Sequence, residues 1–202
     1  MNTIKPCEIV SLCNHYRAPL EISQQVALWT EVVIFLLFSA FIAWSIFRKR
    51  YDLLKRMGVT FIAVLLFEFL IDPVVENRGF SGWTYFLHDI TFVVTLAWVM
   101  LISFSIDAVE IVFSKSSNFM RFLLTLCLLD LLVLICEIFL VSFGLRTYGP
   151  SAAANPLGLY IPYTAVPFGV AIVIPAMLAL VLGFIKYWEK LLGIGSGTRQ
   201  AI

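Results

Sequence analysis

The sequence predicts an all-α, polytopic membrane protein: a bundle of about five transmembrane helices with its N-terminus outside and its C-terminus in the cytoplasm. Three observations support this fold: the composition, the length of the apolar runs and the distribution of basic residues. Of the 202 residues, 61% are hydrophobic and only 13% are charged, whereas soluble domains carry about 25% charged residues. So few charges cannot cover a water-facing surface, so lipid must cover much of the protein.

Five long apolar runs supply the predicted spans. A helix needs about 20 mostly apolar residues to cross the hydrocarbon core of a bilayer. The runs are Trp29–Phe47, Gly58–Val75, Ile90–Phe113, Phe122–Phe143 and Tyr163–Trp188. The strands of a membrane barrel would instead be short and alternate between apolar and polar residues.

The basic residues predict the orientation of these spans. Cytoplasmic segments of membrane proteins carry an excess of Lys and Arg. With five spans, ten basic residues fall on one side of the membrane: Arg48, Lys49, Arg50, Lys55, Arg56, Lys115, Arg121, Lys186, Lys190 and Arg199. Only four fall on the other side: Lys5, Arg17, Arg78 and Arg146. We therefore expect residues 1–25 to form an external cap, 26–190 the bundle and 191–202 a cytoplasmic tail, in a cell or inner membrane.

The cysteine and histidine content limits the chemistry. Cys7 and Cys13 lie in the predicted cap on the oxidising side, where they either form a disulfide or remain free thiols. Cys127 and Cys136 lie inside the fourth span and are expected to be small packing residues. With two histidines and no metal-binding motif, we expect no metal and no cofactor. The net charge of +1 gives no indication of a nucleic-acid partner.

Acidic residues within the spans are the candidate catalytic groups. An unpaired carboxylate at bilayer depth is energetically costly, so such residues usually have a function. Glu68 lies near the middle of the second span, and Asp72 follows four residues later on the same helix face. Glu137 lies in the outer half of the fourth span, and Asp89 at the outer start of the third. We expect these four to converge on a cavity in the outer half of the bundle, where a buried carboxyl group can hold and deliver a proton.

Aromatic and basic residues near the same end are candidates for substrate binding. They are Trp83, Tyr85, Arg78, Arg146, Tyr148 and Trp98. In the alternative interpretation, the polar groups form interhelical hydrogen bonds and ion pairs, for example between Glu76 and Arg78 or Arg146. For Glu68 we expect a protonated side chain hydrogen-bonded to Asp72, Thr95 or Glu137.

Two carboxylates near the inner end of the third span have a simpler interpretation. Asp107 and Glu110 are expected to face cytoplasmic water and Lys115.

The two halves of the chain after the first span share a pattern. Each contains a span with a glutamate, Glu68 or Glu137, then an external loop with glycine and tyrosine, then another span. The two units descend from one ancestor, or the similarity arose by chance.

One segment resembles a known group of enzymes. The stretch Phe67-Glu68-Phe69, the loop with Gly79, Gly82 and Tyr85, and the following helix with Leu96-Ala97-Trp98 resemble small membrane proteins of carotenoid modification. The glutamate of the second span is also similar to the acidic residue of membrane-bound terpene cyclases. The resemblance covers about residues 62–100, and it implies that Glu68 donates a proton to an alkene or an epoxide.

These observations lead to three functional hypotheses. The first is a membrane-embedded enzyme, an isoprenoid or terpenoid cyclase or hydratase, that acts on an isoprenoid or other membrane lipid by carboxylate acid–base chemistry. The second is a non-enzymatic subunit of a larger membrane complex, or of a homo-oligomer, in which the carboxylates hold helices together. The third is a small proton-coupled carrier, although spans with so few polar residues make a poor aqueous pathway.

Overall fold

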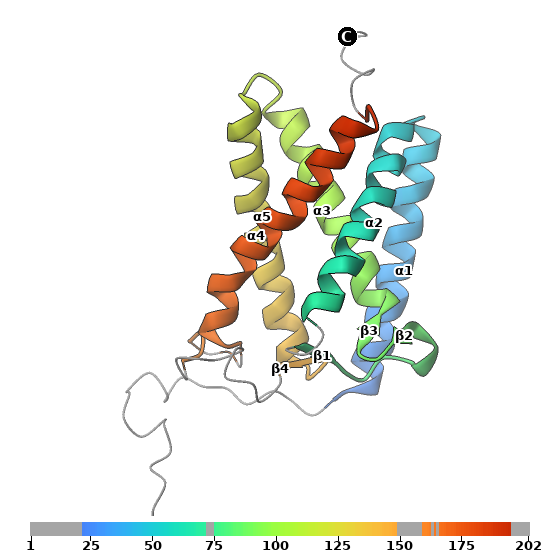
Figure 1. Ribbon diagram of the computed structural model, residues 1–202. Helices are drawn as coiled ribbons and strands as arrows, with labels where there is room; N and C mark the ends of the chain where they lie inside the picture. The colour runs from blue at the N-terminus through green and yellow to red at the C-terminus, as the bar shows by residue number, and fades with distance from the viewer. Residues whose placement is uncertain (1–21, 72–74, 149–158, 163, 165, 195–202) are drawn as a thin grey trace, which may run out of the picture.

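The computed structural model describes residues 22–71, 75–148, 159–162, 164 and 166–194. Five long helices dominate this part of the chain. They are α1 (Gln24–Phe47), α2 (Tyr51–Ile71), α3 (Phe92–Val112), α4 (Asn118–Ser142) and α5 (Phe168–Leu191). The prediction of an all-α bundle is confirmed (Figure 1). The predicted cap with Cys7 and Cys13 lies outside the described residues.

Helices α2 to α5 form a four-helix bundle, and α1 packs on its outside. Going around the bundle, α2 contacts α3, α3 contacts α4, α4 contacts α5, and α5 contacts α2. Helix α1 packs against α3 and, over a smaller area, against α2. The face of α3 that points away from the centre of the bundle therefore lies between α1 and α4.

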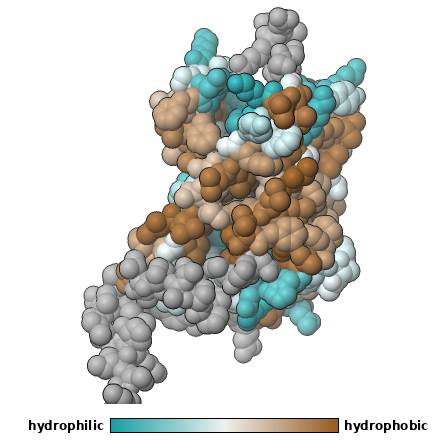
Figure 2. Space-filling model, viewed as in Figure 1, coloured by the Kyte–Doolittle hydropathy of each residue, from teal (hydrophilic) through white to brown (hydrophobic). Residues whose placement is uncertain are grey.

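Four of the five described helices, α1, α3, α4 and α5, are long and apolar enough to cross a membrane. At 1.5 Å per residue, even the shortest of the five, with 21 residues, is about 32 Å long, and the hydrocarbon core is about 30 Å thick. Helix α2 differs because Asp52, Lys55 and Arg56 in its first two turns and Glu68 near its end add charge. Figure 2 shows hydrophobic residues across the middle of the molecule and hydrophilic residues toward its ends.

Local sequence signals explain where the helices begin. Ser23, Thr91 and Ser117 each cap a helix with a side-chain oxygen that accepts a hydrogen bond from a backbone amide of the first turn. Helix α5 begins at Phe168, directly after Pro167, and continues through Pro175. The prediction that the fifth span starts at Tyr163 was wrong, because a proline such as Pro167 disfavours helical geometry in the residue before it.

Short strands close one end of the bundle. Strand β1 (Val75–Asn77) follows α2 and pairs antiparallel with β4 (Arg146–Tyr148), which follows α4. The second span thus ends at Ile71 rather than Val75, because Val75 belongs to a strand. A single turn of 3₁₀ helix (Gly82–Thr84) leads into β2 (Tyr85–Leu87), which pairs with β3 (Ile90–Thr91).

The strand pairing joins equivalent positions of the two similar segments. Asn77 lies directly opposite Arg146, and each comes nine residues after the glutamate of its own unit, Glu68 or Glu137. The contacts of α2 with α3 and with α5 likewise correspond to those of α4 with α5 and with α3. This is the arrangement that two related helix–strand–helix units would adopt around an axis along the bundle.

The bundle interior has a polar layer at each end and an aliphatic middle. The middle is filled by fully buried side chains from all four helices, among them Val64, Val99, Leu129, Val133, Leu178 and Leu182. Glu68 and Glu137 lie toward the end with the strands, and Arg56 and Glu189 toward the opposite end. Well-packed aliphatic residues thus separate the two polar layers.

The basic residues gather at one end, as predicted from the alternation of the spans. Nine of the ten expected on the cytoplasmic side lie in the described chain, in the turns between α1 and α2 and between α3 and α4 and in the adjoining helix ends. At the strand end, Arg78 and Arg146 are the basic residues of the described chain. We call the strand end outer and the basic end inner, an orientation that remains a prediction.

Candidate functional site

A buried ion pair lies at the centre of the outer end. Glu137 in the last turns of α4 and Arg146 in β4 are 4% and 3% exposed. The turn after α4 passes through Gly144, whose positive φ reverses the chain. Arg146 thereby returns to α4, and its Nη1 forms an ion pair with Oε1 of Glu137.

Asn77 extends this pair into a network across the outer end. The Nε of Arg146 donates a hydrogen bond to Oδ1 of Asn77 (3.0 Å). The Nδ2 of Asn77 donates to the backbone carbonyl of Asp89 (2.9 Å), and the Tyr85 hydroxyl donates to the carbonyl of Asn77 (3.1 Å). One buried amide therefore joins β1, β4 and the loop before α3.

Tyr148 completes the coordination of Glu137. Its hydroxyl donates to Oε2 of the carboxylate at 2.5 Å. Burial raises the pKa of Tyr148 well above its usual range, and the nearby negative charge of Glu137 raises it further. Burial alone would lower the pKa of Arg146, but the charge of Glu137 and its hydrogen bond with the guanidinium outweigh this effect, so the pKa rises and the guanidinium keeps its charge.

Glu68 lies beside this network, on the face of α2 that packs against α3. It is 5% exposed, and its Oε2 is 2.6 Å from the Thr95 hydroxyl. The same hydroxyl lies 3.0 Å from the carbonyl of Thr91. A threonine hydroxyl has one hydrogen, so it cannot donate to both acceptors at once. Both contacts are satisfied if Glu68 is protonated, donates to Thr95, and Thr95 donates to Thr91.

The charge balance agrees with a neutral Glu68. Its charge would interact with that of Arg146, but Arg146 is already paired with Glu137. The other oxygen of Glu68, Oε1, is buried and has no hydrogen-bond partner among the described residues. Of the three predicted partners, the structure places Thr95 on Glu68; Glu137 pairs with Arg146, and Asp72 lies outside the described residues.

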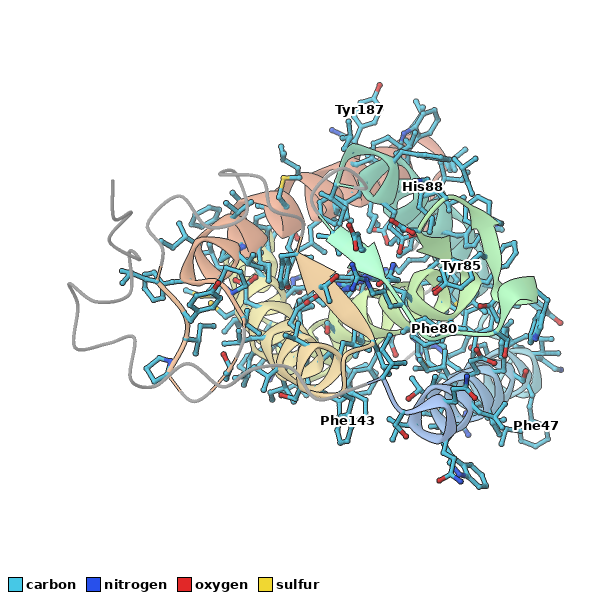
Figure 3. All side chains as sticks on the ribbon, turned by 90° about the horizontal axis from the view of Figure 1, so that it is seen from below. Phe47, Phe80, Tyr85, His88, Phe143 and Tyr187 are labelled. Carbon is cyan, nitrogen blue, oxygen red and sulfur yellow. The ribbon has the colours of Figure 1, made fainter. Side chains whose placement is uncertain are left out.

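A groove on the surface of the bundle reaches this ion pair. It lies between α1 and α4, over the face of α3 that points away from the centre of the bundle, and has a volume of about 620 Å³. Its walls are almost entirely apolar, and its charged lining residues are Glu137 and Arg146. Figure 3 looks onto the outer end and shows two other lining residues, Phe80 and Phe143, on the side of the bundle between α1 and α4. The groove opens sideways, between two helices that are long and apolar enough to cross a membrane.

A third buried carboxylate, Glu31 of α1, fixes the loop that closes the groove. The buried carboxylate of Glu31 accepts hydrogen bonds from the backbone amide and the hydroxyl of Ser81. Phe80, the neighbour of Ser81, is thereby held in the groove wall. Glu31 was not among the predicted site residues, although it is a carboxylate within an apolar run, the same signal that identified Glu68 and Glu137.

The predicted site residues separate into two groups. Five of them lie in or beside the buried network: Glu68, Glu137, Arg146, Tyr85 and Tyr148. Trp98 lies in the groove wall and contacts Phe67 of α2 edge-on.

The remaining predicted residues lie away from the groove. Arg78 forms an exposed ion pair with Glu76, and the Arg78 hydrogen bond and charge lower the pKa of Glu76. Trp83 is exposed and stacks on Phe35. Asp89 contributes its backbone carbonyl to the network, while its carboxylate lies 3.3 Å from Nδ1 of His88.

At the inner end, two expectations need correction. Asp107 binds Arg50 with both carboxylate oxygens, and Glu110 pairs with Arg56 and Lys186 rather than Lys115. Lys115 is exposed in the turn after α3, whereas Arg56 of α2 and Lys186 of α5 lie against Glu110 of α3. In the described chain, no group of three or more His, Cys, Asp or Glu side chains is arranged to hold a metal ion.

Comparisons with known proteins give no relative for this chain. No family model matches it, and neither a curated protein nor a solved structure does so. A functional proposal must therefore rest on the groove and the buried network.

Proposed function

We propose that this protein is a membrane-embedded enzyme that takes an isoprenoid or other long-chain lipid into the groove between α1 and α4 and acts on it by carboxyl acid–base chemistry. One observation carries the proposal: an otherwise apolar groove that opens toward lipid has Glu137 and Arg146 in its wall, with Glu68 beside Arg146.

The groove suits a molecule with a long apolar part and a polar group. Its aromatic and aliphatic walls favour a hydrocarbon chain, and the lateral opening lets the chain enter from the bilayer. A hydroxyl, epoxide or carbonyl oxygen at one end of the molecule can accept a hydrogen bond from Arg146. Such a ligand would lie with its chain along α3 and its polar end at the ion pair.

Glu68 and Glu137 supply the acid–base chemistry in this proposal. Glu68 holds the transferable proton, and Glu137 is the carboxyl group at the groove wall. In the proposed step, the Glu68 carboxyl group gives its proton to an alkene carbon or epoxide oxygen of the bound lipid, which leaves a carbocation and the Glu68 carboxylate. The cation then loses a proton to the carboxylate, so an isomerisation or cyclisation needs no co-reactant. Tyr148 and Arg146 stabilise the ionised form of Glu137.

A non-enzymatic membrane subunit is the second candidate function. The observation that favours it is that both oxygens of Glu137 have partners within the chain, Arg146 and Tyr148. A network that is satisfied in this way can serve to fix the strands on the bundle. A carrier is less well supported, because aliphatic side chains fill the middle of the bundle.

Blocking the groove tests the binding step. Ala97 lies in the groove on α3, so Ala97→Phe should fill part of its volume. Ala43→Phe, at an exposed position of α1, makes the same change outside the groove. We expect native mass spectrometry of protein purified in mild detergent to find a co-purifying lipid with the wild type and with Ala43→Phe, and several-fold less with Ala97→Phe. Equal lipid occupancy in both variants would remove the groove as the binding site.

Two substitutions of Glu68 separate the enzyme from the subunit. Glu68→Gln keeps the size and hydrogen bonding of the side chain but removes the transferable proton, whereas Glu68→Leu also leaves the Thr95 hydroxyl without its partner. If the protein is an enzyme, the Glu68→Gln variant should fold and retain the lipid but no longer convert it. Conversion of the lipid is measured by chromatography and mass spectrometry. For a subunit, Glu68→Gln should be nearly silent and Glu68→Leu should reduce assembly and thermal stability. Full conversion by Glu68→Gln would exclude the catalytic assignment.

A further inference from the structure

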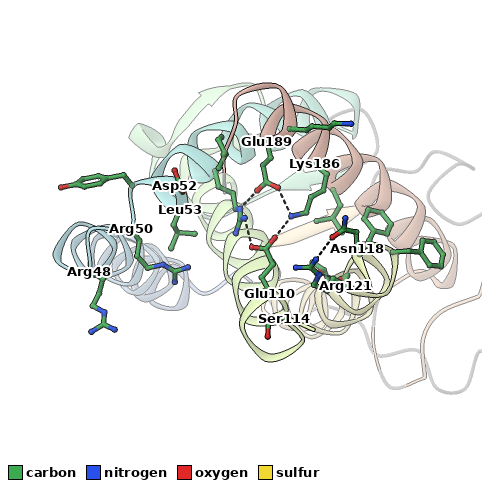
Figure 4. Close-up of a pocket in the computed structure, with 18 of the residues that line it drawn as sticks. Arg48, Arg50, Asp52, Leu53, Glu110, Ser114, Asn118, Arg121, Lys186 and Glu189 are labelled. Carbon is green, nitrogen blue, oxygen red and sulfur yellow. Dashed lines mark hydrogen bonds and ion pairs between the residues drawn. The ribbon is translucent and has the colours of Figure 1, made fainter. Parts of the chain in front are cut away.

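The inner end of the four-helix bundle is hollow and strongly basic. A cleft of about 1030 Å³ lies between the turn after α1, the start of α2, the end of α3, the start of α4 and the end of α5 (Figure 4). Seven cationic side chains line it: Arg48, Lys49, Arg50, Arg56, Arg121, Lys186 and Lys190. Three carboxylates line it: Asp52, Glu110 and Glu189. The cleft is separate from the groove and shares no residue with it.

Some of these charges neutralise one another. Arg56 pairs with Glu110 and Glu189, and Lys186 pairs with the same two carboxylates, so the four side chains form a closed ring with no net charge. The dashed lines in Figure 4 follow this ring. Both carboxylates of the ring are thereby occupied.

Arg50 is also occupied, because it binds Asp107 on α3 with two of its nitrogens.

Four cations of the cleft remain without a carboxylate partner, and the third carboxylate of the cleft, Asp52, pairs with Lys55 outside it. Within the described chain, Arg48, Lys49, Arg121 and Lys190 form no ion pair with a carboxylate. The Nε of Arg121 is buried and has no acceptor among the described residues, although its Nη2 donates to Asn118. A buried guanidinium nitrogen without an acceptor is energetically unfavourable, so this geometry favours an acceptor oxygen supplied by a ligand.

The helices add to the positive potential of the cleft. Both α2 and α4 begin at its wall, at Tyr51 and Asn118. The N-terminal end of a long helix carries a partial positive charge and free amide groups, which favours anions. The positive-inside distribution alone explains why basic residues lie at this end, but it does not require them to surround one hollow.

We propose that this cleft binds the phosphate group of an anionic ligand, carried either by a membrane lipid headgroup or by a soluble phosphate compound. Arginine forms paired hydrogen bonds to phosphate oxygens, and lysine adds charge. The cleft is much larger than a bare phosphate, and Phe119, Phe122, Leu182 and Ile194 give it an apolar part. It can therefore hold the glycerol and first carbons of a lipid, or the organic part of a soluble ester.

Thermal unfolding of the full chain in detergent, followed by tryptophan fluorescence, tests this site. The probes are short-chain phosphatidylglycerol, short-chain phosphatidylcholine and inorganic pyrophosphate, each compared with sodium chloride at equal ionic strength. The cleft variant is Arg121→Gln with Lys190→Gln. The matched control is Lys55→Gln with Lys115→Gln, which removes two positive charges at the same end from residues that do not line the cleft.

We expect a saturable rise in melting temperature with at least one phosphate probe, and a half-saturating concentration about tenfold higher in the cleft variant but unchanged in the control. Saturation by phosphatidylglycerol alone identifies a lipid ligand, and saturation by pyrophosphate identifies a soluble one. The proposal is overturned if neither anionic probe raises the melting temperature more than sodium chloride does. It is also overturned if phosphatidylcholine raises the melting temperature as much as both anionic probes do. An equal loss of affinity for the phosphate probe in both double variants also overturns the proposal, because it indicates a diffuse effect of surface charge. Lys190→Gln alone, at an exposed position, provides the comparison if the double variant does not fold; a half-saturating concentration equal to the wild type would then overturn the proposal.

Discussion

Replacing Arg146 by Met should destabilise the outer end of the bundle more than any exposed charge change there. Arg146 is 3% exposed and compensates the buried carboxylate of Glu137. Its loss leaves Glu137 with Tyr148 as its hydrogen-bond donor and leaves Oδ1 of Asn77 without the Arg146 donor. Methionine preserves most of the length of the side chain, so the effect comes from lost charge and hydrogen bonds rather than from an empty cavity.

The expected magnitude follows from the burial of the pair. Removing one partner of a buried ion pair costs about 3–5 kcal/mol of unfolding free energy. The Tyr148 hydroxyl still donates to Glu137 and limits this cost, so we expect a value toward the lower end. Adding Glu137→Gln to Arg146→Met removes the uncompensated charge and keeps an acceptor for Tyr148. The double variant should therefore recover at least about 1.5 kcal/mol relative to the sum of the single changes.

The assay is unfolding in mixed micelles, with helix content followed by circular dichroism. The matched control is Arg78→Gln, which breaks the exposed pair with Glu76 at the same end and should cost at most about 1 kcal/mol, since water screens such pairs. The reasoning is refuted if Arg146→Met costs no more than Arg78→Gln, or if the double variant shows no recovery.

Two further predictions follow from the outer network and the bundle ends. Because the pKa of Tyr148 is raised in the folded protein, its contribution to stability is present below about pH 10, the unfolded value, and is lost as the pH rises toward the folded value. Tyr148→Phe should weaken the decline of melting temperature above pH 10, while Tyr187→Phe, at an exposed position, should not. If the melting temperatures of the two variants depend on pH in the same way, the raised pKa of Tyr148 is contradicted. For topology, a cysteine in place of Ser116 at the inner turn of an otherwise cysteine-free chain should react with an impermeant thiol reagent only after permeabilisation, and one in place of Trp83 should react in intact cells. The opposite labelling pattern would invert the assigned orientation.

The sequence was sufficient to predict the helical part of the fold. A run such as Trp29–Phe47 has one low-energy form in lipid, because only a helix satisfies its own backbone hydrogen bonds locally. The predicted ends were less accurate where polar and apolar residues mix. Val75 belongs to a strand and Arg56 to a helix, since strand pairing and ion pairing outweighed local hydropathy at these positions.

The site was predictable only in part, for a related reason. Burial of a carboxylate in an apolar run can be deduced from the sequence, so Glu68 and Glu137 were identifiable. Which group neutralises each one depends on the path of the chain between helices. The turn at Gly144 brings Arg146 back to Glu137, and the packing of α2 against α5 brings Arg56 to Glu189 across the bundle.

The sequence by itself therefore determined that the chain forms apolar helices and that certain carboxylates must be buried, because both depend on transfer of local segments out of water. Only the tertiary structure decided that Asn77 joins the strands, that α1 and α4 leave a groove ending at Glu137, and that basic residues from separate turns surround one inner cleft. These features depend on which helices pack together, and nearly uniform apolar faces carry little sequence information about their neighbours.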